Sequence, residues 1–179
     1  MSRSSGDCTR HATYFAQPAL IGTAVHTAFV HGTLTIHEEW PTGERPRVAQ
    51  AMCLVDEAGG RVTIVHLHGL RDPSGKGDTP ARAAQARRLA ELVEQSGEED
   101  DLSIVCGDLN LLPDSDTFRV LAEVGLTDLV GTADTRTSRY TKTTRHASYL
   151  LISDTGAVRH FNVLREPEVS DHACLLLEI

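Results

Sequence analysis

Residues 102–110 most restrict the folds open to this chain, because an apolar run, LSIVC, ends directly in Gly-Asp-Leu-Asn. An apolar run of this length bounded by turn residues predicts a buried strand. In extended geometry Asp108 and Asn110 lie two residues apart and point to the same side of the chain. The sequence therefore predicts a buried strand that presents a carboxylate and a carboxamide together at its end.

Other strands and two helices surround this strand in the sequence. The runs 49–55 and 61–67, separated by Asp-Glu-Ala-Gly-Gly, predict a hairpin. Thr79 suits the N-cap and Pro80 the first position of a helix over 81–95. A shorter helix is expected over 115–123, closed by Gly125, and further strands over 19–30, 33–40, 148–153, 157–163 and 173–178.

This order of elements predicts one domain over residues 14–179, preceded by a loose polar tail of residues 1–13. Strands dominate and two helices are clear, so the class is α+β or layered α/β, and periodicity alone leaves that choice open. The composition, 40% hydrophobic and 23% charged over 179 residues, is typical of a single globular domain.

The net charge, the apolar content and the cysteine spacing limit the functions and locations that the sequence favours. A net charge of −8, with no Lys/Arg run longer than two residues, disfavours charge-driven nucleic-acid binding but leaves open a phosphate substrate held by a few arginines and a metal. No stretch is apolar enough for a membrane span or a signal peptide. Cys8, Cys53, Cys106 and Cys174 show no C-x-x-C spacing, so we expect free thiols, buried for the last three, in a reducing cytoplasm.

Asp108 and Asn110 are the first candidates for chemistry. A carboxylate beside a carboxamide suits a hard cation such as Mg²⁺, or the orientation of a water for attack on phosphorus. The structural alternative is a loop in which both residues cap turns and the next helix. In VSDHACLLLEI, Asp171 could bind metal and His172 could take a proton, whereas Ser-Asp alone is an ordinary turn.

Two further segments carry weaker signals. In VHLHGL, His66 and His68 fall on one strand face, but no third ligand stands at a spacing that would predict zinc. In GKGDTPARAAQ, Lys76, Arg82 and Gln85 could line the mouth of a phosphate site. A solvated loop and helix face explains the same residues, and their spacing alone favours that explanation.

The order of these motifs resembles the endonuclease/exonuclease/phosphatase superfamily, whose members carry N-T-H-L, G-D-[FL]-N and S-D-H. The likeness covers roughly residues 20–179 and is closest to an uncharacterised bacterial branch with segments such as HGLRDPSGKGDTPARAAQ, GDLNLLPDSDTF and TRTSRYTKTTRHASYLLISD. The resemblance implies a DNase I-like, four-layer α/β sandwich that hydrolyses phosphodiesters or phosphomonoesters with Mg²⁺ or Mn²⁺. The partner it implies is a phosphate-ester substrate.

The resemblance also implies a role for each matched residue. His68 is expected near the phosphoryl oxygens, and Asp108 is expected to orient or deprotonate the attacking water on the metal side of the site. Asn110 is expected to stabilise the transition state. Asp171 is expected to be a metal-side carboxylate and His172 the catalytic histidine. His66 stands where the family motif has asparagine.

The chain departs from the family pattern in two places. The first strand-helix-strand of the family, with its metal-binding glutamate, has no counterpart, because no acidic residue lies between Asp7 and Glu38; Glu38 and Glu39 fall by order in a later strand. Ser148 replaces the aspartate that orients the terminal histidine. Two hypotheses follow: a phosphoesterase, intact or impaired, or a non-catalytic binding module or truncated relative that covers an exposed sheet edge by self-association.

Overall fold

The computed structural model describes residues 30–34, 47–55 and 59–179. The expected tail, 1–13, and the residues Glu38 and Glu39 lie outside these ranges, as does most of the strand-like sequence before residue 47. The strands are β1 Val30–Leu34, β2 Arg47–Val55, β3 Arg61–His68, β4 Leu102–Asp108, β5 Thr127–Asp128, β6 Ser148–Ile152, β7 His160–Leu164 and β8 Cys174–Glu178; the helices are α2 Pro80–Ser96, α3 Asp116–Glu123 and the 3₁₀ turn η1 Thr155–Ala157.

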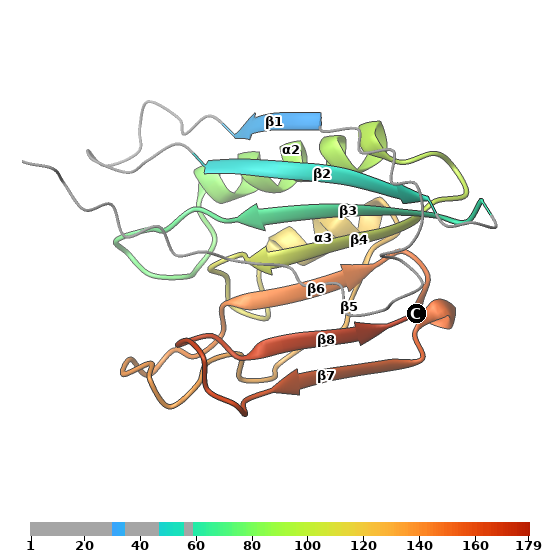
Figure 1. The fold of residues 1–179 in the computed structure, drawn as a ribbon. Coiled ribbons are helices and arrows are strands. Elements are labelled where there is room, and N and C mark those ends of the chain that lie inside the picture. The colour runs from blue at the N-terminus through green and yellow to red at the C-terminus, as the bar shows by residue number, and fades with distance from the viewer. Residues whose placement is uncertain (1–29, 35–46, 56–58) are drawn as a thin grey trace, which may run out of the picture.

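Six strands form one sheet in the order β1-β2-β3-β4-β6-β5, and β7 pairs with β8 beside it (Figure 1). The expected hairpin is confirmed, since β2 and β3 are antiparallel with Ala51 opposite Val65. β3 and β4 are parallel and are joined through α2, the crossover that parallel neighbours require. The described residues therefore form a layered α/β structure.

Both helices begin at the signals that the sequence provides. The hydroxyl of Thr79 accepts from Arg82 N at the start of α2, with Pro80 in the first turn. Ser115 caps α3 in the same way, and Gly125 follows that helix with a φ of 81°. The expected ranges 81–95 and 115–123 are thus confirmed to within one residue.

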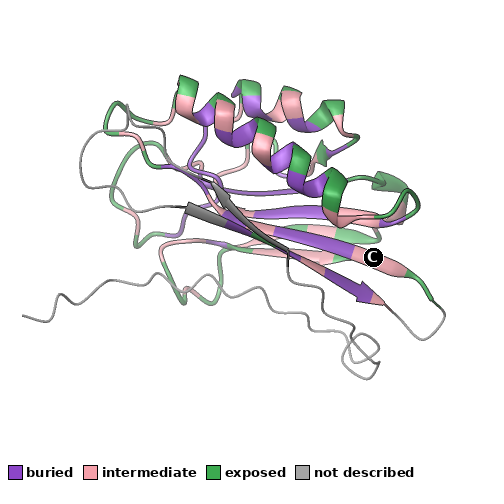
Figure 2. Ribbon diagram, turned by 90° about the horizontal axis from the view of Figure 1, so that it is seen from above, coloured by how far each residue is buried: buried purple, intermediate pink, exposed green. Residues whose placement is uncertain are grey.

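The helices cover one face of the six-stranded sheet (Figure 2). Every second residue of the central strands faces them: Val65, Leu67, Val105 and Leu151 are each 0% exposed. Full burial of a Leu or Val side chain contributes about 1.5–3 kcal/mol relative to exposure, so this face is the main core. The alternate residues point to the opposite face, and the site is built from the last of them.

Three strand positions bring the motif residues into one row. His68 ends β3 opposite Asp108 at the end of β4, and Asp108 lies opposite Ser148 at the start of β6. The strands approach closely here because residue 107 is glycine: its φ is 142°, and a Cβ atom would lie 2.0 Å from Leu67 O. Residues 40 or more positions apart in sequence thus become neighbours.

Three expectations need correction. The strand expected over 157–163 begins at His160, because Asp154 accepts from Gly156 N and caps η1 before it. Cys174 is exposed, since it starts β8 in the separate two-stranded sheet; Cys53 and Cys106 are buried, and none of these three forms a disulfide. The two-residue strand β5 was not expected. No helix among the described residues is long and apolar enough to cross a membrane.

Candidate active site

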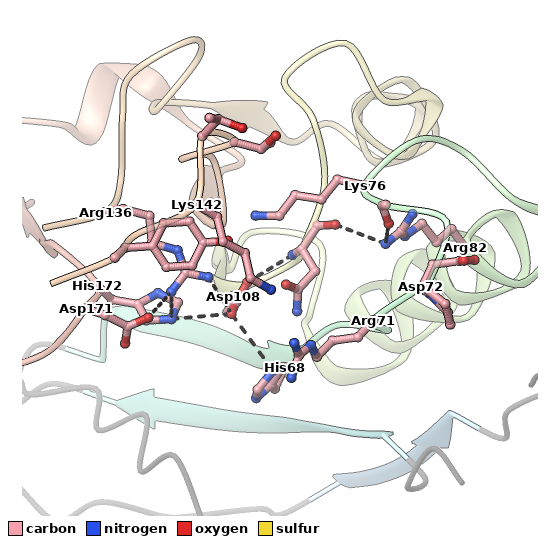
Figure 3. Close-up of a pocket in the computed structure, with 16 residues that line it drawn as sticks. His68, Arg71, Asp72, Lys76, Arg82, Asp108, Arg136, Lys142, Asp171 and His172 are labelled. Atoms are coloured by element: carbon pink, nitrogen blue, oxygen red, sulfur yellow. Dashed lines mark hydrogen bonds and ion pairs between the residues drawn. The ribbon is translucent and has the colours of Figure 1, made fainter. Parts of the chain in front are cut away.

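A pocket of about 450 Å³ opens above the row of strand ends (Figure 3). Five basic side chains line it against three carboxylates, although the whole chain carries a net charge of −8. The pocket therefore concentrates positive charge on an acidic molecule, which favours an anionic ligand. Its lining comprises His68, Arg71, Asp72, Pro73, Gly75, Lys76, Arg82, Asp108, Asn110, Arg136, Tyr140, Lys142, Thr143, Thr144, Asp171 and His172.

Asp108 lies at the floor of the pocket and is 4% exposed. Its Oδ1 accepts from Asn110 N at 3.0 Å. The strand ends at Asp108, and Asn110 adopts a φ of 55°, a left-handed conformation that asparagine tolerates. The prediction that the chain stays extended from Asp108 to Asn110 is therefore wrong. Both residues nevertheless line the same pocket. Asp108 caps this turn and not the following helix, which Ser115 caps.

Two histidines approach the second oxygen of Asp108. His172 Nε2 lies 3.5 Å and His68 Nε2 3.9 Å from Asp108 Oδ2. On the other side of its ring, His172 Nδ1 lies 2.8 Å from Ser148 Oγ. Ser148 therefore holds the terminal histidine with a neutral hydroxyl in place of a carboxylate. His66 does not line the pocket. Its correspondence to the asparagine of the family motif therefore stays a prediction.

Arg136 lines the pocket, although no motif in the sequence marked it as a candidate. Its Nη1 donates to Asp171 Oδ2 at 2.7 Å and lies 2.6 Å from His172 Nε2, and its Nη2 lies 3.7 Å from Asp108 Oδ2. The residue is 5% exposed, and its guanidinium carbon lies 4.2 Å from the centre of the Tyr140 ring. The guanidinium thus occupies the middle of the acidic and imidazole groups (Figure 3).

The position of Arg136 fixes the tautomer of His172. A guanidinium only donates hydrogen bonds, so Nε2 of His172 accepts in this arrangement. The ring proton then lies on Nδ1 and is donated to Ser148 Oγ. The fixed cation of the site is therefore Arg136, because a guanidinium stays charged.

Backbone pairing between two distant segments places these groups. Arg136 and His172 form an isolated antiparallel bridge, and Thr137 N donates to Asp171 O at 3.2 Å. The Ser-Asp-His segment does form a local turn, because Ser170 Oγ accepts from His172 N at 3.0 Å. The turn and the site role therefore coexist in the same residues.

Lys76 and Arg82 differ in how they meet the pocket. Lys76 donates to His146 O and extends toward the side of the pocket that holds Asp108 (Figure 3). Burial lowers the pKa of its ammonium to about 8, opposed by the Asp108 carboxylate and reinforced by Arg136. Its role toward a phosphate stays a prediction.

Arg82 is 1% exposed, so a solvated helix face does not describe it. Its guanidinium donates to the backbone oxygens of Gly77, of Gly75 at 2.9 Å and of Asn110 at 3.2 Å. Burial lowers the pKa of this guanidinium. Gln85, one turn further along α2, accepts from Leu70 N at 2.9 Å. Both side chains hold the loop that forms one wall of the pocket, and contact of Arg82 with a phosphate stays a prediction.

The donor set fits a divalent metal poorly in this arrangement. Mg²⁺ needs open oxygen ligands at roughly 2.1 Å. Both oxygens of Asp108 are engaged by Asn110 N or faced by cationic and imidazole groups, and Asp171 is paired with Arg136. Within the ranges that the structure describes, no three His, Cys, Asp or Glu side chains are arranged to hold a metal ion. We therefore derive no chemical step through a metal.

The arrangement combines a buried carboxylate, two imidazoles, a guanidinium and an amide around one point. Such a set can hold the oxygens of a phosphate-like group through charge-assisted hydrogen bonds. It can also accept a proton from a water placed beside Asp108.

A family model described as the Endonuclease/Exonuclease/phosphatase family matches residues 15–172. The chain belongs to this family, and its α/β fold is of the DNase I-like type found in solved members. The expected superfamily and fold class are therefore confirmed. A comparison with curated protein sequences finds no significant match.

Solved structures share the fold at low identity. A mannosyl-6-phosphatase of Bacteroides thetaiotaomicron is 19% identical with a TM-score of 0.63, over 87% of this chain and 66% of that one. The human Nocturnin catalytic domain, with a bound sulfate anion, is 22% identical with a TM-score of 0.54, over 85% and 60%. Danio rerio TDP2 with a single-strand DNA product is 16% identical with a TM-score of 0.55, over 84% and 67%. The chain thus spans about two thirds or less of the length of these proteins.

Proposed function

We propose that this chain is a phosphoesterase domain that cleaves a phosphodiester or phosphomonoester by in-line attack of water. The observation that carries the proposal is the convergence of His68, His172 and Arg136 on the Asp108 carboxylate at the floor of a basic pocket. Family membership supports the phosphoester class, because related folds include a phosphatase and a protein with a DNA product.

The residues have distinct tasks in this reaction. Asp108 accepts a proton from the attacking water as the new phosphorus–oxygen bond forms. His68, Asn110 and Arg136 hold the phosphoryl oxygens, whose charge spreads in the transition state. The phosphorus–oxygen bond to the alcohol then breaks, and the leaving oxygen takes a proton from solvent. His172, whose Nε2 lies 3.5 Å from Asp108 Oδ2, takes the proton that Asp108 accepted and returns it to solvent.

Three finer expectations remain predictions. Mg²⁺ or Mn²⁺, with Asp108 and Asp171 on the metal side, is one of them, and the guanidinium of Arg136 argues against it. A cytoplasmic location and self-association through a sheet edge are the others. A non-catalytic binding module is the second candidate function, favoured by the replacement of a carboxylate by Ser148 beside His172.

The Asp108→Asn variant separates these functions. We expect hydrolysis of p-nitrophenyl phosphate or bis-(p-nitrophenyl) phosphate by the unaltered chain, and a loss of at least about 100-fold in the variant, because the amide cannot accept the proton. Asp114→Asn, which changes an exposed carboxylate outside the pocket, is the matched control. An Asp108→Asn variant that keeps the unaltered rate would refute the role of Asp108, and an unaltered chain that cleaves neither ester would favour the binding module.

A further inference from the structure

We propose that Arg136 supplies the fixed positive charge that holds a phosphate group in this pocket, so that phosphate binds without a divalent metal ion. The inference rests on the proposed function only because it takes the ligand to be a phosphate group. Its starting point is the place of the guanidinium, within 3.7 Å of Asp108 Oδ2, 2.7 Å of Asp171 Oδ2 and 2.6 Å of His172 Nε2.

Arg136 is held by the protein and does not reach in from the surface. Its backbone bridges to that of His172, its guanidinium lies over the Tyr140 ring at 4.2 Å, and the residue is 5% exposed. A buried arginine is always charged, which sets it apart from an imidazole. The cation is therefore in place before any ligand arrives, which is the preorganisation that transition-state stabilisation requires.

The guanidinium is not fully satisfied by the protein. Within the described ranges its Nε is a buried donor with no hydrogen-bond partner. The two terminal nitrogens face one carboxylate closely and another at 3.7 Å, which is longer than a hydrogen bond. Arg136 therefore retains donor capacity, and guanidinium groups match the oxygens of phosphate in pairs.

A divalent ion would compete with this guanidinium for the same oxygens. Asp171 Oδ2 is already paired with Arg136, and Asp108 Oδ2 faces Arg136, His68 and His172. Bringing a metal to these carboxylates would place two like charges a few ångströms apart, which is unfavourable in a partly desolvated site. The charge that a metal would supply is thus supplied by the chain itself.

The lining strengthens the preference for a phosphate group. Lys76 and Lys142 also line the pocket, and the ammonium of Lys76 lies close enough to both Arg136 and Lys142 for their charges to interact. Among the residues that line the pocket, five basic side chains stand against three carboxylates, and one of these, Asp171, is already paired with Arg136. The excess of positive charge therefore favours a dianion in the pocket.

Calorimetric titration with inorganic phosphate tests the inference directly. We expect the dissociation constant to be the same within about twofold in EDTA and in excess Mg²⁺, with loss of at least about tenfold in affinity in Arg136→Gln. Arg139→Gln, an exposed arginine three residues away outside the pocket, is the matched control and should bind phosphate as the unaltered chain does. Phosphate binding that requires Mg²⁺ would overturn the inference.

Asp171→Asn provides a second test that does not depend on the folding of the Arg136 variant. Removing the carboxylate that pairs with Arg136 should strengthen phosphate binding, because the guanidinium loses its competing partner. If Asp171 holds a metal that binds phosphate, the same change should weaken binding, and that result would overturn the inference.

Hydrolysis assays in EDTA and in Mg²⁺ separate this inference from the proposed function. Metal-independent phosphate binding without hydrolysis in either buffer would leave the inference standing and contradict the function. Hydrolysis with phosphate binding only in Mg²⁺ would leave the function standing and contradict the inference.

Discussion

At the scale of single residues, the site depends on how its histidine is held. Ser148 Oγ lies 2.8 Å from His172 Nδ1, in the place where the family has an aspartate. A hydroxyl can accept the ring proton and orient the imidazole, but it brings no charge to stabilise an imidazolium. Ser148 is therefore a positioning residue whose effect passes through His172.

Ser148→Ala should lower the turnover number about 10–100-fold, with little change in KM, because the imidazole loses its orienting partner. Ser148→Asp should restore turnover, since a carboxylate accepts the same hydrogen bond. Ser153→Ala, just beyond β6 and outside the pocket, is the control. Steady-state kinetics decide the matter, and a Ser148→Ala variant as fast as the unaltered chain would remove Ser148 from the mechanism.

Lys76 makes stability depend on pH in a defined window. Burial lowers its pKa to about 8 from an ordinary value of 10.5, so the unfolded chain binds more protons between these values. The free energy of unfolding then rises with pH through this window. Below about pH 8, the cost of burying the charged ammonium of Lys76 destabilises the folded chain in full.

In Lys76→Met this penalty is absent. The difference in urea-unfolding midpoint between Lys76→Met and the unaltered chain should therefore shift across the window, with the variant relatively more stable at the lower pH. Lys142→Met, an exposed lysine of the same pocket, should show a much smaller shift. Equal pH dependence in all three proteins would contradict the assignment.

Sequence reasoning found the residues that stand in recognisable motifs and missed those that do not. Asp108, Asn110 and His172 follow or precede apolar runs at short spacing, so their position next to strand ends could be predicted. Arg136 lies in a loop with no periodicity, and only its backbone bridge to His172, 36 positions away, brings it into the site. No local pattern encodes that contact.

At the scale of elements, the site depends on the spacing of β3 and β4. Gly107 allows this spacing because a Cβ atom there would lie 2.0 Å from Leu67 O on the neighbouring strand. Its φ of 142° is also a conformation that residues with a side chain rarely adopt.

Gly107→Ala should lower the free energy of unfolding by more than about 2 kcal/mol, because the methyl group meets backbone that cannot move aside. Gly59→Ala, which has a φ of 86° but no atom within 4 Å of the added Cβ, isolates the cost of backbone strain and should lose less. Denaturant unfolding measures both variants. Equal losses would show that close packing of β3 against β4 does not hold the site.

Elements with strong local signals could be predicted from the sequence. Thr79 and Pro80 define the start of α2, and the interrupted apolar runs define the β2–β3 hairpin. Two short elements could not be predicted, because each forms only through contacts with neighbouring residues. β5 has two residues and is held by pairing with β6, and η1 forms because the Asp154 side chain caps it.

At the scale of the whole molecule, charge is distributed unevenly. The chain carries a net charge of −8, yet five basic side chains line one pocket of about 450 Å³. An overall negative field disfavours a long polyanion more than a single phosphate group, because only a small ligand lies wholly within the positive pocket. We therefore predict that a compact phosphoester binds in this pocket better than extended nucleic acid does.

Hydrolysis in water enriched in the heavy isotope of oxygen tests the central claim most directly. If the chain catalyses attack of water on phosphorus, each phosphate released from p-nitrophenyl phosphate should carry one heavy oxygen, and the Asp108→Asn variant should release phosphate at least about 100-fold more slowly. Mass spectrometry of the two products provides the readout. Heavy oxygen in the nitrophenol, or no phosphate beyond that released by the Asp108→Asn variant, would contradict the account.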